Sequence, residues 1–191
     1  TSFPKLPPLA ASAWQFGYGR YDEAKQRTVS FAKLPHWTGS SWQGGAKLPD
    51  PKHGWVLLRA NGGHPGNDEH FAAIRRWTAG EKGTLSITGT LQHGTSKGNG
   101  IRGRIVSSRS GIAGQWIVHN RQAQTTVVKL AVQPGDTIDL STDCHGDVGF
   151  DSFSWTVNLE HKSSGTSSTW KSVAGFHGPV SSAYAALPIQ A

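Results

Sequence analysis

Three aspartates lie close together in the second half of the chain: Asp143, Asp147 and Asp151. They fall in a short glycine-containing segment, and Asp136 and Asp139 precede them in a chain that is otherwise basic. Carboxylate oxygens gathered in a loop are the hard ligands that Ca²⁺ prefers. The segment therefore predicts a structural calcium held by these three side chains. Aspartates also cap turns without a metal, so a plain turn fits the same residues.

Two tryptophans in the segment 36–45 predict an aromatic contact surface. Trp37 and Trp42 lie among His, Thr, Ser and Gly without the alternation of a strand, which indicates a loop. The C–H face of a sugar ring packs on an indole, and Trp gives a large contact area at little entropic cost. We expect both side chains to stack on a saccharide. Burial over the end of a sheet is the alternative, because Trp is usually well buried.

Arginines supply much of the positive charge in the middle of the chain. Arg102 and Arg104 are two residues apart in a strand-like run, so they share one face of it. Guanidinium groups bind sulfate and carboxylate through paired hydrogen bonds. Together with Asn120 and Arg121 they are expected to bind an acidic or sulfated saccharide. A solvated sheet face on which some arginines pair with the aspartates is the alternative.

Other motifs point away from cofactor chemistry. Gly98, Gly100 and Gly103 match a dinucleotide-binding loop by letter, but strand-like residues follow instead of the helix that such a loop requires. His64 and His70 flank a loop with no standard zinc or copper spacing. The single Cys144 lacks the C-x-x-C-H pattern of covalent haem attachment. We therefore expect no covalent haem in this chain. We also expect no enzymatic activity; the weaker alternative is an enzyme built on His and Asp, which requires a concave pocket with two or more titratable groups within hydrogen-bond reach.

Short β-rich runs must position these residues. Runs of β-branched and aromatic residues alternate with Gly, Pro, Asn and Asp clusters, which predicts about ten strands joined by turns. The expected strands are 28–34, 55–60, 71–78, 84–93, 101–108, 115–119, 125–132, 137–142, 152–160 and 169–173.

Two of these runs show which face is buried. Phe153, Trp155, Val157 and Leu159 alternate with polar residues, so one face of that strand is core. The run 128–132 alternates likewise before a Pro-Gly-Asp turn. Short strands at turn spacing without helical interludes predict an all-β fold, a two-sheet antiparallel sandwich of jelly-roll type. The tryptophans expected in its core are Trp55, Trp77, Trp116 and Trp155.

Composition changes at both ends of the chain. Three prolines among residues 1–13 predict an extended lead-in. The sandwich module is expected over 14–161. After it, a Ser- and Thr-rich stretch opens a polar linker and tail over 162–191, whose aromatics would allow it to pack on the sandwich.

Net charge and hydropathy limit the partners. The formal charge is +7 and the pI is near 9.8, which suits a polyanionic partner. The chain has neither a basic run nor a known nucleic-acid-binding motif, so we expect no nucleic acid. Nothing approaches the roughly 20 apolar residues of a membrane span, so we expect no membrane insertion.

The stretch from Trp42 to Glu160 carries a resemblance. It contains the strings IRRW, GRIVSSR and GDTID, followed by DSFSW. In these strings the chain resembles a module of large multidomain cytochrome-type proteins of planctomycete bacteria, a β-sandwich insert similar to carbohydrate-binding modules. The resemblance implies an extracytoplasmic module, periplasmic or secreted, on a haem-type protein. It also implies a structural calcium, with Asp151 as its ligand.

These observations favour a non-catalytic carbohydrate-binding module that targets a larger protein to polysaccharide. A structural or docking module that packs against other domains of its parent protein is the alternative. The first would present an exposed aromatic platform and bind a glycan, whereas the second would present a broad apolar patch and bind none.

Overall fold

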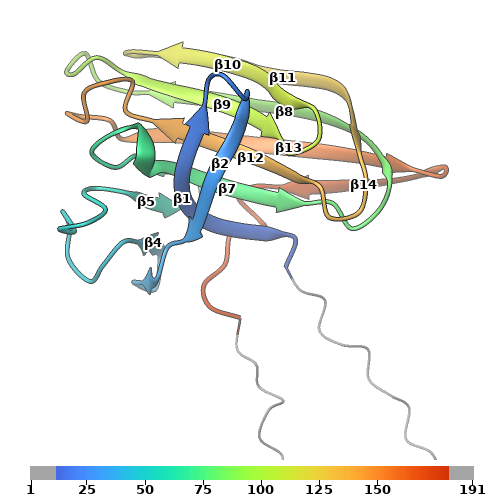
Figure 1. The fold of residues 1–191 in the computed structure, drawn as a ribbon, viewed down its shortest axis with the longest axis horizontal. Helices are drawn as coiled ribbons and strands as arrows, with labels where there is room; N and C mark the ends of the chain where they lie inside the picture. The colour runs from blue at the N-terminus through green and yellow to red at the C-terminus, as the bar shows by residue number, and fades with distance from the viewer. Residues whose placement is uncertain (1–11, 181–191) are drawn as a thin grey trace, which may run out of the picture.

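The computed structural model describes residues 12–180. Its strands form two antiparallel sheets packed face to face, and the one helical element is a short 3₁₀ turn, η1 (Glu69–Phe71) (Figure 1). The predicted all-β, two-sheet antiparallel sandwich is confirmed. Within the described range, no helix has the length and apolar character needed to cross a membrane.

Six strands make up the first sheet. Three of its middle strands fall in the runs 71–78, 101–108 and 137–142 that the sequence predicts as strands, and its last two strands form a hairpin at one edge. In spatial order the strands are β10 (Gly111–Val118), β9 (Ile101–Ser107), β12 (Thr137–Asp143), β7 (Ala72–Thr78), β1 (Trp14–Asp22) and β2 (Arg27–Lys33).

The second sheet has long strands on one side and short ones on the other. In spatial order they are β11 (Arg121–Val132), β8 (Gly83–His93), β13 (Phe153–Ser163), β6 (Gly62–His64), β5 (Leu57–Arg59), β4 (Ser41–Gln43) and β3 (His36–Trp37). An eighth strand, β14 (Thr166–Lys171), pairs with the far half of β13.

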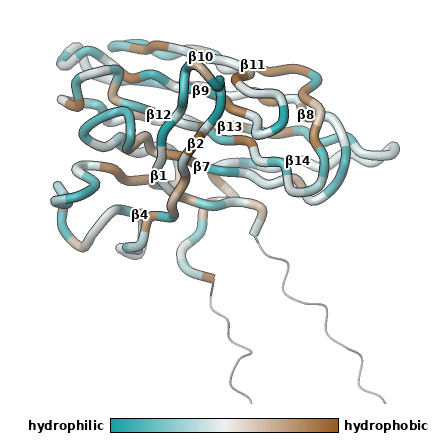
Figure 2. Tube along the Cα trace, viewed as in Figure 1, coloured by the Kyte–Doolittle hydropathy of each residue, from teal (hydrophilic) through white to brown (hydrophobic). Residues whose placement is uncertain are grey.

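The core lies between the two sheets. Along β13 the apolar side chains alternate inward with polar ones outward, as predicted, and apolar residues recur along the strands in Figure 2. Trp77 and Trp155 are buried in this core, which confirms two predictions, and Trp116 packs against its margin. Trp55 was expected in the core but is 43% exposed, because it precedes β5 instead of lying inside a strand.

The hairpin of β1 and β2 folds across the outer face of the first sheet. Arg27 on β2 donates hydrogen bonds to the carbonyls of Ser108 and Arg109, beyond the end of β9. The hairpin bends where the register shifts between Arg20 and Tyr21. It buries charged side chains that an open sheet face would expose.

The C-terminal part of the sandwich differs from the prediction. The polar linker and tail are expected from residue 162, with a strand only at 169–173, but β13 continues to Ser163 and β14 returns along it as an antiparallel hairpin from Thr166 to Lys171. Ser and Thr have side chains that suit an exposed strand, which is why composition alone misplaced the boundary. Residues 172–180 then pack against the sandwich. The rest of the expected lead-in and tail, 1–11 and 181–191, lies outside the described residues.

Candidate functional site

Trp37 and Trp42 pair with each other and are covered by the C-terminal segment. They face one another across the short hairpin of β3 and β4, not a loop, with ring centroids 5.2 Å apart. Phe176 lies 5.7 Å from Trp37, and the Trp42 indole donates to the His177 carbonyl at 2.7 Å. Both rings are half-buried. They therefore fit the alternative, burial of Trp over the end of a sheet, better than an exposed surface for stacking a saccharide.

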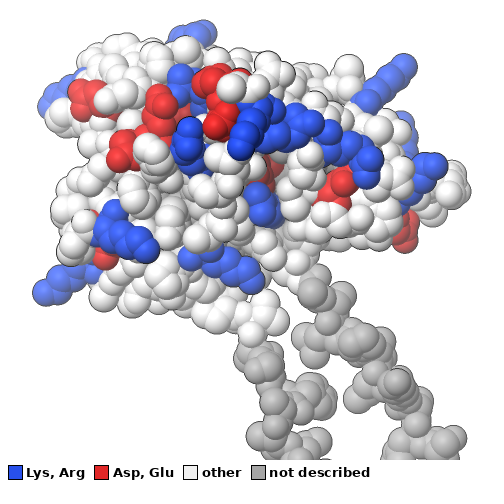
Figure 3. Space-filling view, viewed as in Figure 1, with Lys and Arg blue, Asp and Glu red and all other residues white. Residues whose placement is uncertain are grey.

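Arg102 and Arg104 are held in ion pairs beneath the β1–β2 hairpin. Arg104 is only 2% exposed and donates to Asp143 at 2.5 Å and to Glu23 at 2.5 Å. Arg102 donates to Asp143 at 3.1 Å and to Glu69 at 2.7 Å. In Figure 3 basic and acidic side chains lie interleaved on this face. The arginines pair with Asp143, as the alternative expected, but Arg104 is buried and does not lie on a solvated face.

Asn120 and Arg121 lie at the turn from β10 to β11. The Asn120 N–H donates to His93, and Arg121 donates to the Ile117 carbonyl. Because β11 and β3 are opposite edges of the second sheet, this turn is on the order of 25 Å from the tryptophan pair. The six predicted ligand-binding residues thus lie in three separate places.

The three predicted calcium ligands also differ in their surroundings. Asp143 accepts from Arg102, from Arg104 and from the His145 N–H. Asp147 is exposed and accepts from the Gly149 N–H, and Asp151 is buried without a hydrogen-bond partner. Over residues 12–180, no three His, Cys, Asp or Glu side chains converge as a metal site. The three aspartates therefore do not form the cluster that their spacing predicted.

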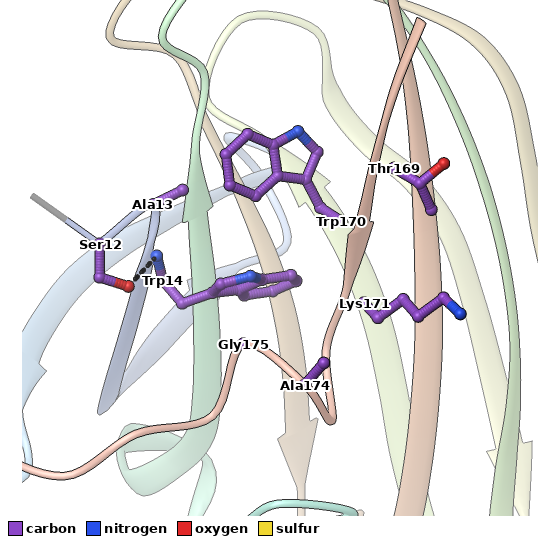
Figure 4. A pocket seen from close by; sticks show the side chains of 8 residues that line it. All are labelled: Ser12, Ala13, Trp14, Thr169, Trp170, Lys171, Ala174 and Gly175. Carbon is purple, nitrogen blue, oxygen red and sulfur yellow. Dashed lines mark hydrogen bonds between the residues drawn. The ribbon is translucent and has the colours of Figure 1, made fainter. Parts of the chain in front are cut away.

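A cleft lies between Trp14 and Trp170. It has a volume of about 490 Å³ and is lined by Ser12, Ala13, Trp14, Thr169, Trp170, Lys171, Ala174 and Gly175. Figure 4 shows the two indoles facing the opening from different strands, with the Trp170 ring seen face-on and the Trp14 ring edge-on. Trp170 is the exposed aromatic wall of the cleft, whereas Trp14 is only 4% exposed and belongs to the core.

Neighbouring residues fix both indoles. Trp170 meets the buried Trp77 edge-to-face at a centroid distance of 6.0 Å and remains 36% exposed. Trp14 starts β1, and its backbone N–H donates to the Ser12 hydroxyl at 3.1 Å. Gly175 has no room for a side chain, since a Cβ would overlap the Trp14 ring. The cleft is thus formed by side chains that are already held in place.

Polar groups border this aromatic surface. Thr169 and Lys171 flank Trp170 on β14 and line the cleft, although their side chains extend to the other side of the strand from the Trp170 indole (Figure 4). A small number of polar groups beside an apolar wall is typical of small-molecule sites. The exposed Trp170 ring suits a ligand with a C–H face.

Comparisons with known proteins add no relative. The chain matches no family model, no curated protein and no solved structure. The function is therefore argued from the site alone.

Sequence reasoning did not identify the cleft. Trp170 lies in a run of Ser and Thr and was assigned to a polar tail, and Trp14 precedes a glycine-rich segment. The available signal was a lone tryptophan in a polar, strand-compatible run, since an isolated Trp on an exposed strand is seldom without a contact.

A second cleft of about 270 Å³ lies between Trp14 and Trp42, beside Gly178 and Pro179.

Proposed function

We propose that this chain is a non-catalytic carbohydrate-binding module, with the cleft between Trp14 and Trp170 as its saccharide site. The observation that carries the proposal is the exposed Trp170 ring above an aromatic cleft large enough for a sugar. A saccharide ring has an apolar C–H face, and the exposed Trp170 ring offers a surface on which such a face can pack.

The charge beside the cleft favours an acidic or sulfated ligand. Lys171 is the cation that lines the cleft, whereas Arg102 and Arg104 are engaged in internal ion pairs. A single ammonium group at the edge adds affinity for carboxylate or sulfate, while stacking on Trp170 provides a contact that salt does not screen. We therefore expect binding to weaken with salt but to persist at moderate ionic strength.

Affinity electrophoresis tests this proposal. The whole chain is run through gels that contain a neutral, a uronate-rich or a sulfated polysaccharide, at low and at moderate salt. Retardation by one polysaccharide that survives moderate salt is expected. Trp170→Ala should weaken binding about tenfold, because a stacked aromatic contact contributes on the order of 1.4 kcal/mol.

Trp55→Ala is the matched control, since Trp55 is equally an exposed tryptophan but lies outside the cleft. Its affinity should equal that of the unmodified chain. If no polysaccharide retards the chain, or if all retardation disappears with salt, specific saccharide binding is wrong. The docking alternative, packing against other domains of a parent protein, then becomes the better account.

A further inference from the structure

Arg75 is a cation inside the core of the sandwich. On β7 it shares the inward face with Ala73 and Trp77, which belong to the core, and it is only 3% exposed. No Asp or Glu side chain of the described residues forms an ion pair with it. Burial alone lowers the pKa of Arg75 to about 10, so the guanidinium group stays charged at neutral pH. A buried charge has lost its hydration and requires a counter-charge nearby.

Three backbone carbonyls use only part of the hydrogen-bonding capacity of Arg75. Its Nη1 donates to the carbonyls of Ala60 at 2.9 Å and Ser172 at 2.5 Å, and its Nη2 donates to the Arg59 carbonyl at 2.5 Å. A guanidinium group has five N–H bonds, so one at Nε and one at Nη2 remain. The three carbonyls carry no net charge, so they leave the positive charge of Arg75 without a counter-charge.

A small cavity lies between the two sheets, and Arg75 forms part of its wall. Its volume is about 10 Å³, which is room for about one water molecule. The apolar and aromatic side chains that line it are Leu58, Leu140, Phe153 and Trp155. Thr142 also lines it, and its hydroxyl is buried without a hydrogen-bond partner among the described residues. Thr142 pairs with Ala73 across β12 and β7, so it faces the core from the same side as Arg75.

We propose that this cavity binds one small monovalent anion between Arg75 and Thr142, with chloride as the best match. A halide accepts the remaining Arg75 N–H bonds and the Thr142 O–H together, and it supplies the missing negative charge. A water molecule accepts at most two hydrogen bonds and supplies no charge, so it satisfies these donors less well. Sulfate and phosphate are too large for a cavity with room for one water molecule. The site is independent of the saccharide cleft, which lies at Trp14 and Trp170.

Thermal unfolding in two sodium salts tests the site. The whole chain is melted in sodium chloride and in sodium methanesulfonate at equal ionic strength, since methanesulfonate is too large for the cavity. We expect chloride to raise Tm by about 3 °C, because a ligand that binds only the folded state stabilises it by mass action. Crystals grown in sodium bromide locate the ion, because bromide scatters anomalously. They should show one bromide within hydrogen-bond distance of the Arg75 guanidinium group and the Thr142 hydroxyl.

Two variants separate this site from a general effect of salt. Thr142→Val keeps the shape of the side chain and removes the O–H donor, so chloride should raise its Tm by less than about 1 °C. Ser141→Ala is the matched control, since the Ser141 hydroxyl is also buried without a partner but lies on the opposite face of β12, outside the cavity. Its chloride shift should equal that of the unmodified chain. Equal Tm values of the unmodified chain in both salts, a full chloride shift in Thr142→Val, or water instead of bromide beside Arg75 overturns the proposal.

Discussion

His64 is a titratable group whose charge state is coupled to folding. It ends β6 beside Trp55, with ring centroids 6.3 Å apart, and its Nδ1–H donates to the Pro65 carbonyl at 2.7 Å. Burial lowers the pKa of His64 below its usual value. The hydrogen bond to Pro65 raises this pKa, and the positive charge of Arg59 lowers it. The folded state therefore favours the neutral ring.

The sign of the resulting pH dependence follows directly. The unfolded chain takes up the proton near pH 6.5, before the folded chain does, so stability falls as pH decreases below that value. His64→Asn retains a donor for the Pro65 carbonyl and cannot titrate. Between pH 7.5 and 5, its Tm should decrease less than that of the unmodified chain. Exposed His70→Asn is the control, and an identical pH profile for all three proteins contradicts the assignment.

Asp143 is the residue on which the buried ion-pair network depends. It accepts from both Arg102 and Arg104, whereas Arg104 also contacts Gln115, Glu23 and the Tyr21 ring. Its replacement leaves two guanidinium groups without their shared carboxylate, but replacement of Arg104 leaves Asp143 paired with Arg102. We expect Asp143→Ala to cost about 3–5 kcal/mol and Arg104→Met clearly less.

Urea denaturation measures this order. Linear extrapolation of both variants gives the two losses in free energy of unfolding on the same scale. Equal losses, or a larger loss for Arg104→Met, would show that Asp143 is not the centre of the network.

At the scale of elements, β1 depends on glycines that bring β2 close. A Cβ at Gly17 would overlap the Ala32 carbonyl and the Phe31 ring of β2. Gly17→Ala should therefore cost about 1–3 kcal/mol, because the hairpin must move to make room. Gly80→Ala is the matched control, since nothing lies within 4 Å of its Cβ position, and it should change stability by less than about 0.5 kcal/mol. Equal stability of both variants in urea denaturation would contradict the close packing of this hairpin.

The same glycines explain what the sequence predicted poorly. Residues 152–160 alternate clearly and lie in β13 as expected, because periodicity reports burial on one face directly. Residues 137–142, predicted as a strand, lie in β12. β1 was missed because Gly17 and Gly19 lower β-propensity, although close approach of β2 requires them.

Contacts between segments that are distant in the sequence also determine which side chains of the candidate site are exposed or covered. Trp170 faces a cleft because residues 166–171 return along β13, and Trp37 is covered because Phe176 packs on it. The sequence likewise does not show which side chains pair with Arg102 and Arg104, because those partners lie in other segments of the chain. Local residue patterns contain no information about which distant segment covers a side chain.

At the scale of the whole molecule, the paired charged side chains and the proposed saccharide cleft lie in different places. The net charge is +7, yet many arginines pair with carboxylates on the face of the β1–β2 hairpin (Figure 3). Both ends of the described chain emerge on the side of the molecule near the start of β1 (Figure 1). The cleft lies between β1 and β14, so the proposed saccharide site is next to those ends.

The location of binding is the central claim, and NMR of the indole N–H groups measures it most directly. The chain has 8 tryptophans, each with one indole N–H signal assignable by single substitution. On titration with oligosaccharide from the polysaccharide that retards the chain, the Trp170 and Trp14 signals should shift most. Shifts confined to Trp37, Trp42 or Trp55, with Trp14 and Trp170 unchanged, would contradict the account.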